Sequence, residues 1–440
     1  MSYGDDRMSQ FKWSKYNYYI IENDMIIVFN FYSMQLLHTN DKSTLFYYLQ
    51  NFINKTPVKP PEDFIEKQFV VCANLDEDSQ LEKMYTTHMA STAMQLTIFA
   101  NEMCNFKCIY CYEDNTGSEM SHDLIPGILN FIKDKVAENK YETLNIEWFG
   151  GEPLLSHNLI FKFSTLLSQL IPNLHTTHSM STNGYRLDPP MFERMLNVGV
   201  NMFQISLDGN KSSHDQYRMT KNGKGTFDTI WSNIEAIHQN DSNFNILIRA
   251  NFNEQNYMDV FHLIDLIKTL DDKRFSMHFH PIVDMGGTNN EGLTYCCDNI
   301  FGDVAVTEYF RVCIQEKVKC DAWSLNALPL GGNCYASNPN FFAIDVNGII
   351  RRCTVAIKSD FNEIGRILND HKYYLDVEQN EKWLYNYCAN DPQCDNCEMK
   401  PHCYGPGCPE PLLRNGERPC RKNTYFFDEI LKEIVTLTTP

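Results

Sequence analysis

The sequence predicts an α/β protein with a partial barrel at its centre. Short apolar strands alternate with amphipathic helices from about residue 94, and the sequence after about residue 331 is rich in Gly, Pro and Cys with little periodicity. Strands that alternate with helices favour a parallel sheet, and right-handed crossovers curl such a sheet towards a barrel. The chain of 440 residues is too long for one ordinary core, so we expect further domains on both sides.

Residues 1–93 predict a small α+β module that is winged-helix-like. Two β-rich apolar runs within residues 17–39 flank the sequence Glu22-Asn23-Asp24, which is typical of a hairpin. Residues 43–53 have a helical pattern, and Ser43 or Thr44 is the expected N-cap.

Residues 94–310 predict a (β/α)6 partial barrel of the TIM type. We expect helices between the strands, for example at 124–137 and 227–239. The expected strands are 94–100, 143–149, 176–182, 200–207, 244–252 and 275–283. A bridging region at 311–330, a cysteine-rich domain at 331–425 and a C-terminal helix at 426–440 are expected to follow.

Composition and charge limit the possible functions. Hydrophobic residues make up 43% of the chain, which excludes global disorder, and the net charge of −18 argues against binding nucleic acid through its phosphates. The N-terminal residues lack a secretory signal, and no run of about 18 apolar residues occurs. We therefore expect a cytoplasmic protein without a membrane partner.

The 16 cysteines point to metal chemistry, because a reducing compartment disfavours disulfides. Cys104, Cys108 and Cys111 form a CxxxCxxC motif directly after the first barrel strand. Three thiolates at this spacing can ligate three irons of a cubane and leave the fourth iron open for catalysis. A structural zinc site would need a fourth ligand, and a redox pair of Cys108 and Cys111 would leave Cys104 unexplained.

This motif, with Tyr110 before its last cysteine, resembles the signature of the radical S-adenosylmethionine (SAM) superfamily. The resemblance implies a catalytic [4Fe–4S] cluster on Cys104, Cys108 and Cys111, whose open iron binds S-adenosyl-L-methionine. It further implies cleavage of that cofactor to a 5′-deoxyadenosyl radical, which abstracts a hydrogen atom. An electron donor of the flavodoxin or ferredoxin type is the implied partner.

Loops at successive strand ends resemble further motifs of that superfamily. Phe149-Gly150-Gly151-Glu152-Pro153 is similar to its GGEP motif, and His214-Asp215-Gln216-Tyr217-Arg218 with Gly223-Lys224-Gly225-Thr226-Phe227 is similar to an HDxxR…GxGTF run. Ser181–Gly184, Ser206–Gly209, Arg249 and Asn251 end the next strands in similar style. The implied cofactor-binding residues are Tyr110, Gly150, Gly151, Glu152, Ser181, Asn183, Ser206, Asp208 and Arg218. Singly, each loop also fits an ordinary tight turn, as at Gly209.

The C-terminal cysteines resemble the SPASM extension, which carries two auxiliary [4Fe–4S] clusters, although the last block has four residues where the family has three before Cys408. The resemblance assigns one cluster to Cys334, Cys353 and Cys408, with Cys320 as the candidate fourth ligand. It assigns the other cluster to Cys394, Cys397, Cys403 and Cys420, and leaves Cys388 without a role. Two zinc ions would also suit seven or eight cysteines, and iron content distinguishes the two interpretations.

SPASM enzymes act mostly on peptides and proteins. Sulfatase-maturing relatives place an acidic residue where this chain has Thr354, which counts against sulfatase maturation. The N-terminal module resembles the leader-binding module of peptide maturases, and the alternative is a structural cap on the barrel. We therefore expect a maturase of a ribosomally synthesised precursor peptide with a leader, which installs a cross-link: a thioether first, a carbon–carbon bond second.

Three alternatives remain open at this point. A radical SAM enzyme of the same type acting on a folded protein or a small molecule is the first. The second is an epimerase, with Cys296, Cys297 or Cys313 as a thiol hydrogen donor, although a buried structural thiol suits each of them as well. The third is a zinc-binding scaffold without catalytic activity.

Overall fold

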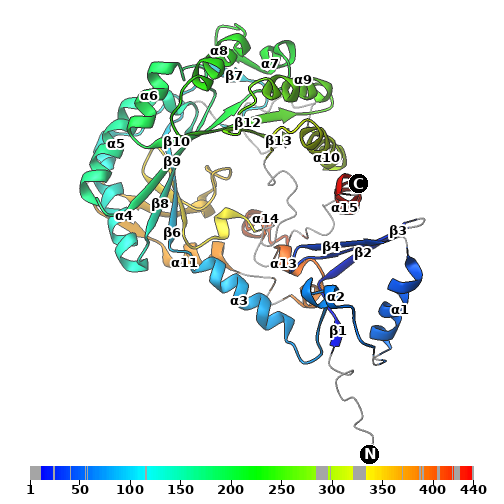
Figure 1. Ribbon diagram of the computed structural model, residues 1–440. Helices are drawn as coiled ribbons and strands as arrows, with labels where there is room; N and C mark the ends of the chain where they lie inside the picture. Colours follow the sequence, from blue (N-terminus) through cyan, green and yellow to red (C-terminus); the bar gives the residue numbers. More distant parts are fainter. Residues whose placement is uncertain are drawn as a thin grey trace, which may run out of the picture.

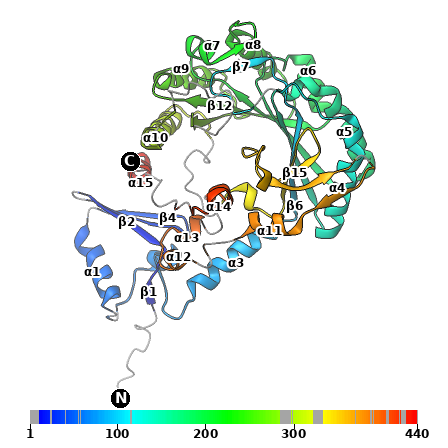
Figure 2. The same ribbon diagram turned by 180° about the vertical axis from the view of Figure 1, so that it is seen from behind.

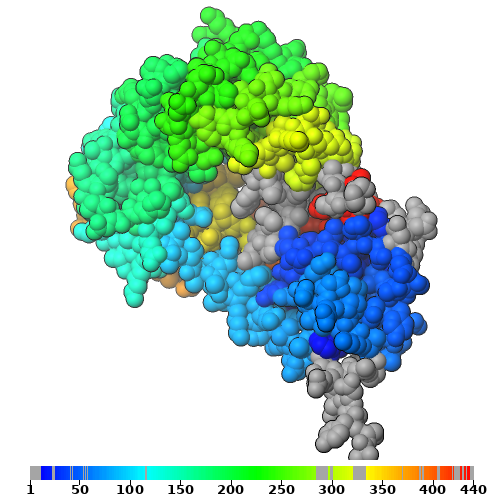
Figure 3. Space-filling view, in the orientation of Figure 1, coloured from blue at the N-terminus to red at the C-terminus, as the bar shows by residue number. Residues whose placement is uncertain are grey.

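A computed structural model gives the fold (Figure 1). It describes residues 11–22, 25–39, 41–54, 56, 58–113, 116–283, 296–297, 299–320, 333–368, 370–385, 388, 391–403, 407–418, 420 and 427–438. An arc of parallel strands with helices on its outer side forms the larger part of the molecule. The N-terminal residues form a second lobe beside it, shown in blue in the space-filling view (Figure 3).

The arc is the predicted partial barrel. All neighbouring pairs among its six strands are parallel, in chain order. The strands are β6 (Ala93–Asn101), β8 (Thr143–Gly150), β9 (His175–Thr182), β10 (Val200–Ser206), β12 (Asn245–Phe252) and β13 (Phe275–Pro281). The helices that follow them are α4 (Ile125–Asn139), α5 (His157–Leu170), α6 (Pro189–Asn197), α7 (Lys211–Tyr217), α8 (Phe227–His238), α9 (Tyr257–Lys268) and α10 (Asn299–Gln315). The predicted fold class is therefore confirmed.

The two faces of these strands differ in polarity. Along β8 every second residue, Leu144, Ile146 and Trp148, is buried in the core shared with the helices. The alternate residues on the inner face of the barrel are more polar, for example Glu147 on β8, Gln204 on β10 and Arg249 on β12, and they line a cavity. A barrel interior is usually filled by branched apolar side chains, so this polar lining indicates space kept for ligands.

The sheet does not end at β6. Strand β14 (Phe341–Ile344) pairs with β6 in parallel, and three antiparallel strands extend the sheet to ten strands. These are β15 (Ile349–Arg351), β16 (Glu363–Ile367) and β17 (Tyr373–Leu375), and β14 lies between β6 and β15 in the sheet; Figure 2 shows this part of the molecule from behind. The helices of this region are α11 (Val377–Leu384), α12 (Pro392–Asp395), α13 (Lys400–Cys403) and α14 (Glu410–Asn415). The cysteine-rich region is thus joined to the barrel through backbone hydrogen bonds, which its weak periodicity did not predict.

The N-terminal lobe contains two small sheets. β2 (Asn17–Glu22) and β3 (Met25–Asn30) form the predicted hairpin, whose turn residues 23–24 lie outside the described residues, and β4 (Gln35–Thr39) pairs on the other side of β3. Helix α1 (Lys42–Ile53) is capped by Asp41, not by Ser43 or Thr44 as expected, because the Asp41 carboxylate accepts from Thr44 N and from both hydroxyls. The remaining elements are β1 (Phe11–Trp13), β5 (Val70–Cys72), α2 (Glu62–Glu66) and α3 (Glu77–Met89).

The C-terminal helix α15 (Phe427–Thr438) joins the two lobes. Its residues Phe427, Leu431 and Val435 pack with Ile27 and Phe29 of β3. The same helix contacts α10 of the barrel. None of the helices in the described ranges is long and apolar enough to cross a membrane.

Candidate active site at the carboxyl ends of the barrel strands

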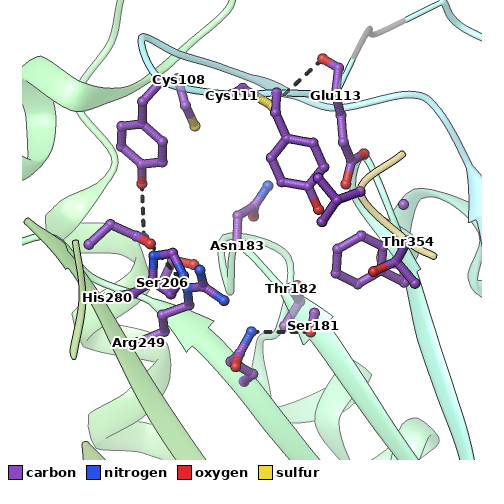
Figure 4. A pocket seen from close by; sticks show the side chains of 18 of the residues that line it. Cys108, Cys111, Glu113, Ser181, Thr182, Asn183, Ser206, Arg249, His280 and Thr354 are labelled. Atoms are coloured by element: carbon purple, nitrogen blue, oxygen red, sulfur yellow. Dashed lines mark hydrogen bonds between the residues drawn. The ribbon is translucent and has the colours of Figure 1, made fainter. Parts of the chain in front are cut away.

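The three cysteines of the CxxxCxxC motif line one cavity of about 530 Å³ at the carboxyl ends of the barrel strands. The loop that carries them is held by a short antiparallel pair of strands, β7 (Phe106–Cys108) and β11 (Arg218–Thr220), which places Cys108 opposite Arg218. Ile109 N also donates to Tyr217 O at 3.0 Å. The structure therefore couples the cysteine loop to the segment that follows α7. Figure 4 shows Cys108 and Cys111 on the same side of the cavity.

The electrostatics of the three thiols suit a bound cation. Burial raises the pKa of Cys104 and of Cys111 to about 12, and it also raises the pKa of Cys108. Proximity to the other thiols adds to the increase for Cys104 and Cys111. Three half-buried soft donors around one cavity fit an iron–sulfur cluster, because binding of the iron displaces the thiol protons.

The glycines of the GGEP motif serve close packing against the cysteine loop. A Cβ atom at Gly150, where φ is +116°, would lie 2.0 Å from Asn101 O. A Cβ atom at Gly151 would lie 2.4 Å from Met103 O. Glu152 N donates to the same Met103 oxygen at 2.7 Å. The end of β8 thus fixes the backbone directly before Cys104, and both glycines also line the cavity.

Glu152 does not line the cavity in this structure. Its buried carboxylate accepts from Leu154 N at 3.0 Å, from the Thr182 hydroxyl at 2.7 Å and from Asn183 N at 2.7 Å. Asn183 in turn donates from Nδ2 to Asn105 Oδ1 at 2.8 Å and lies 3.8 Å from Cys104 Sγ. In this structure Glu152 anchors the end of β9 through these hydrogen bonds, and its contact with the cofactor stays a prediction.

Tyr110 is the centre of a buried polar network. Its hydroxyl accepts from Arg218 Nη1 at 2.5 Å and from Asn251 Nδ2 at 3.1 Å, and it donates to Asp208. Asp208 also accepts from Asn251 N at 3.0 Å. Asp208, a predicted cofactor contact, is thus buried behind Tyr110 and does not line the cavity, whereas Tyr110, Ser181, Asn183 and Ser206 do.

Arg218 has a hydrogen-bond donor that is available to a ligand. It lines the cavity, and among the residues that the structure describes its buried Nε has no hydrogen-bond partner. The neighbouring Cys108, Tyr110 and Asp208 keep it charged, and its pKa lies well above the usual value despite the opposing effect of burial. A buried guanidinium with an open donor suits a carboxylate, which is the group that SAM presents at its methionyl end.

Residues of the HDxxR and GxGTF motifs hold Asp208 and Arg218 of this network in place through hydrogen bonds. His214 accepts from Asp208 N at 3.2 Å, and its Nε2 lies 3.0 Å from the Thr226 hydroxyl, which donates to Arg218 O. Asp215 accepts from Thr226 N at 2.6 Å and so caps the start of α8. A Cβ atom at Gly225 would lie 2.2 Å from the Asp215 carboxylate, which explains the glycine.

Several residues of the cavity were not predicted. Glu113, directly after Tyr112, is half-buried in the cavity, and its pKa is raised to about 8 by partial burial and by the nearby Glu102 and Glu152. The inner faces of the strands contribute further polar residues that were not predicted: Thr97, Glu147, Gln204 and His280. Figure 4 shows Arg249, Ser181 and Thr182 on the side of the cavity away from the thiols. Polar residues at alternate positions of otherwise apolar strands were the signal that would have found them.

The first predicted auxiliary set is brought together in part. Cys334 and Cys408 are in side-chain contact, and Cys353 lies close enough to affect Cys334 electrostatically. Cys334 N donates to Gly407 O at 2.9 Å, which joins the two segments. The buried Asn362 holds Cys353 by accepting from Cys353 N at 2.9 Å and donating to Cys353 O at 2.8 Å. This donor set fits an auxiliary cluster.

Cys320, the candidate fourth ligand of that set, lies elsewhere. Its backbone forms an isolated β-bridge with Met277 of β13, and its side chain contacts that of Cys313 of α10. Cys334 precedes β14, which pairs with β6 at the opposite edge of the six parallel strands. The described contacts therefore do not bring Cys320 together with Cys334.

In the second predicted set, Cys394 contacts a cysteine that was not assigned to the set. Cys394 is in side-chain contact with Cys388, which was left without a role. Cys420 is exposed, whereas Cys394, Cys397 and Cys403 are half-buried.

The fold and the site define an iron–sulfur barrel enzyme whose open cavity can hold a second cofactor. Residues 99–267 match the family model of the radical SAM superfamily. The protein is a radical SAM enzyme of the SPASM type that uses a [4Fe–4S] cluster and S-adenosyl-L-methionine.

Relatives and solved structures extend this result. The chain is 25% identical over 349 residues to the serine-type anaerobic sulfatase-maturating enzyme of Klebsiella aerogenes, which covers 74% of this chain and 82% of the relative. It is 21% identical over 420 residues to the radical SAM cyclopropyl synthase TigE of Paramaledivibacter caminithermalis. This match covers 88% of this chain and 83% of the relative.

Two solved structures have a similar fold. Native anSMEcpe with bound AdoMet matches with a TM-score of 0.58 and 17% identity, over 78% of this chain and 96% of that chain. Streptococcus suis SuiB bound to the precursor peptide SuiA matches with a TM-score of 0.51 and 14% identity, over 96% and 100%.

Proposed function

We propose that this enzyme modifies a ribosomally synthesised precursor peptide, and that it forms a thioether cross-link or, as a second possibility, a carbon–carbon cross-link. The observation that carries this proposal is the N-terminal lobe, which offers an edge strand next to the domain that holds the auxiliary cysteines. The lobe suits the capture of a leader segment as an added strand.

Strand β2 has the properties of such a docking edge. Among the described strands it pairs on one side only, with β3. Tyr19 and Ile21 alternate along it and are 55% and 50% exposed, whereas Ile20 between them is buried. An extended peptide added to β2 would gain backbone hydrogen bonds and apolar contacts with these two side chains.

The lobe is firmly attached to the cysteine-rich domain. Lys400, between Cys397 and Cys403, forms an ion pair with Asp78 of α3 at 3.2 Å. Lys15 donates to Asp395 O at 3.3 Å. A leader bound on this lobe is therefore held at a fixed position relative to the auxiliary cysteines, which favours a leader-binding role over a simple cap on the barrel.

The substrate side of the cavity argues against sulfatase maturation. Thr354 lines the cavity at the position where sulfatase-maturing relatives carry an acidic residue. Its hydroxyl lies 2.6 Å from the Tyr335 hydroxyl, and position 354 itself offers no carboxylate to take a proton. The likeness to SuiB, which was solved with a precursor peptide and matches 96% of this chain, supports a peptide substrate.

The chain's own residues divide the work as follows. The bound cluster and cofactor supply the 5′-deoxyadenosyl radical. Cys104, Cys108 and Cys111 hold the cluster, Arg218 pairs with the cofactor carboxylate, and Tyr110 orients Arg218. The sets at Cys334 and at Cys394 would hold auxiliary clusters, and the chemistry that such clusters would supply is the acceptance of an electron. A flavodoxin- or ferredoxin-type donor and a cytoplasmic location complete the proposal.

The test first searches the neighbouring reading frames for a short precursor peptide and then uses such a peptide as substrate, with reduced enzyme and SAM in the absence of oxygen. We expect the peptide to lose two hydrogen atoms for each link, because one leaves with deoxyadenosine and one as a proton. Ile21→Lys should raise KM for the full peptide by about tenfold and leave its leaderless core unaffected, whereas Met258→Lys on α9, at a site 64% exposed, should change neither.

Two results would contradict this proposal. Equal KM values for Ile21→Lys and the parent enzyme would exclude leader capture at β2. Turnover of a sulfatase peptide but of no leader-bearing peptide would favour the alternative of a folded-protein substrate, which the sulfatase-maturating relatives make the second candidate. Zinc in place of iron after anaerobic isolation would leave only a scaffold.

A further inference from the structure

Arg249, near the carboxyl end of β12, has no part in the division of work proposed above. It lines the inner wall of the cavity, where its side chain is half-buried. Figure 4 shows it beside His280, on the side of the cavity away from the thiols. Burial lowers the pKa of Arg249, yet a guanidinium stays protonated at neutral pH, so this wall carries a fixed positive charge inside the barrel.

The Arg249 side chain is held in place by the polar network behind it. Its Nε donates to Asn251 Oδ1 at 3.0 Å. Asn251 is fixed in turn, because its N and its Nδ2 each donate to Asp208 Oδ1 at 3.0 Å. The Nδ2 group of Asn251 also donates to the Tyr110 hydroxyl at 3.1 Å. Arg249 is therefore oriented before a ligand arrives, which lowers the entropic cost of binding.

The two Nη groups of Arg249 are open to the cavity. Within the described ranges, neither of them donates a hydrogen bond, and no carboxylate lies within ion-pairing distance of the guanidinium. Glu147 lines the same cavity, but its carboxylate accepts from the Thr97 and Ser181 hydroxyls, each at 3.1 Å. The positive charge of Arg249 is thus without a partner in the part of the chain that the structure describes.

The neighbours of Arg249 respond to this charge. Burial and the nearby guanidinium together lower the pKa of His278 to about 4 and lower the pKa of His280 well below its usual value. Both imidazoles are therefore neutral at pH 7, and the guanidinium supplies the positive charge of this wall. In a half-enclosed cavity the effective dielectric is lower than in water, so this charge favours an anion over a neutral group.

We propose that Arg249 binds a carboxylate of the peptide substrate, from an Asp or Glu side chain or from the end of the peptide. A planar guanidinium with two open Nη groups matches a carboxylate in a bidentate geometry. The single carboxylate of SAM is assigned to Arg218, which Tyr110 holds next to the cysteine loop, so a second arginine requires a second anion. The inference rests on the proposed function for the peptide nature of the substrate, and it adds an acidic group near the modified residue.

The test uses a precursor peptide that the parent enzyme modifies. The acidic residues of its core are changed to Asn or Gln one at a time, and its C-terminus is amidated in a further peptide. We expect one of these changes to lower kcat/KM about 10- to 100-fold, and Arg249→Gln to cause the same loss with the unchanged peptide. The two changes together should cost no more than either alone, because both remove the same ion pair. Arg249→Lys, which keeps the charge, should lose less than Arg249→Gln.

Two controls separate this role from a structural role or a cofactor contact. Arg366→Gln on β16 removes a half-exposed arginine that pairs with Glu363 at 3.1 Å and does not line the cavity. This variant should keep the parent kcat/KM with every peptide. The Arg249→Gln variant should keep the parent iron content and, without peptide, the parent affinity for SAM.

A protection experiment needs neither a variant nor the natural peptide. The parent holoenzyme with SAM is treated with phenylglyoxal, which modifies arginine, and the modified residues are identified by mass spectrometry. We expect N-acetyl-L-glutamate to slow the modification of Arg249 several-fold, whereas N-acetyl-L-glutamine at the same ionic strength should leave it unchanged. Arg366 should react equally in both cases.

The outcomes separate the two proposals. Additive losses for Arg249→Gln and the altered peptides, or weaker binding of SAM by this variant, would overturn the carboxylate site. Equal protection of Arg249 by the two acetylated amino acids would overturn it as well. Failure of the parent enzyme to modify any leader-bearing peptide would instead contradict the proposed function, and the protection experiment would still decide whether Arg249 binds a carboxylate.

Discussion

Arg218 Nη1 donates to the Tyr110 hydroxyl at 2.5 Å, so the residue before the third cysteine of the motif is tied to the strand that follows α7. The register of β7 and β11 enforces this relationship, because it sets Cys108 opposite Arg218. The cysteine loop and the arginine that we assign to the cofactor carboxylate are therefore one structural unit.

Tyr110→Phe tests this unit. The variant keeps the aromatic ring but removes the oxygen shared by Arg218, Asp208 and Asn251. Hydrogen bonds to charged groups contribute about 1.5–3 kcal/mol, so we expect SAM to bind about 10- to 100-fold more weakly. Equilibrium dialysis with labelled SAM measures the affinity. The iron content should stay at the parent value, and a loss of iron would show that the phenol supports the cluster loop instead.

Gly151→Ala should displace the cysteine loop. The added Cβ would lie 2.4 Å from Met103 O, directly before Cys104, and a backbone oxygen cannot yield as a flexible side chain can. We expect about four fewer irons per chain and no formation of deoxyadenosine. Gly199→Ala is the control: it has the more demanding φ of +89°, yet its Cβ would meet only His178 Cδ2 at 3.8 Å. If both variants kept their iron, the close approach of β8 would not matter for the cluster.

Asn362→Ala should weaken the first auxiliary site. The Asn362 side chain is fully buried and accepts from Arg352 N at 3.0 Å as well as from Cys353 N, and its Nδ2 also donates to Ala356 O at 2.9 Å. Removing it leaves buried backbone groups unpaired, at about 1–3 kcal/mol for each group. We expect a lower urea midpoint and loss of iron from this site. Asn338 makes fewer such bonds, and Asn338→Ala should have the smaller effect.

The barrel was predictable because its strands are long, apolar and regularly spaced, and because each ends in a recognisable loop. The extension through β14–β17 was not, since its strands have three to five residues and lie in a region without clear periodicity.

The residues of the site divide in the same way. Local spacing was enough to predict the loop of Cys104, Cys108 and Cys111. The position of Glu152 depends on Thr182 and Asn183, some 30 residues later in the chain, and no local pattern encodes that contact. The placement of Cys320 beside Cys313 likewise follows from the packing of α10 against the barrel.

The last prediction concerns acid stability and depends on His178 of β9. This residue is buried in the core between the strands and α5, where Trp148 Nε1 donates to its Nδ1 at 3.3 Å. Burial lowers the pKa of His178 from 6.5 to about 4. Between these two values the unfolded chain binds a proton that the folded chain does not, so the free energy of unfolding falls as the pH falls through this window and is fully retained above about pH 6.5.

At about pH 5.5 the loss from this one histidine should be about 1.4 kcal/mol relative to about pH 7.5. His178→Gln keeps an acceptor for the Trp148 N–H but cannot be protonated, so its free energy of unfolding should fall by that much less over the same interval. Urea unfolding of both proteins at the two pH values, followed by tryptophan fluorescence, measures the difference. His214, whose pKa is also lowered by burial, is unchanged in the variant and contributes equally to both proteins, so it cancels. Parallel pH dependences would show that His178 is already protonated in the folded barrel.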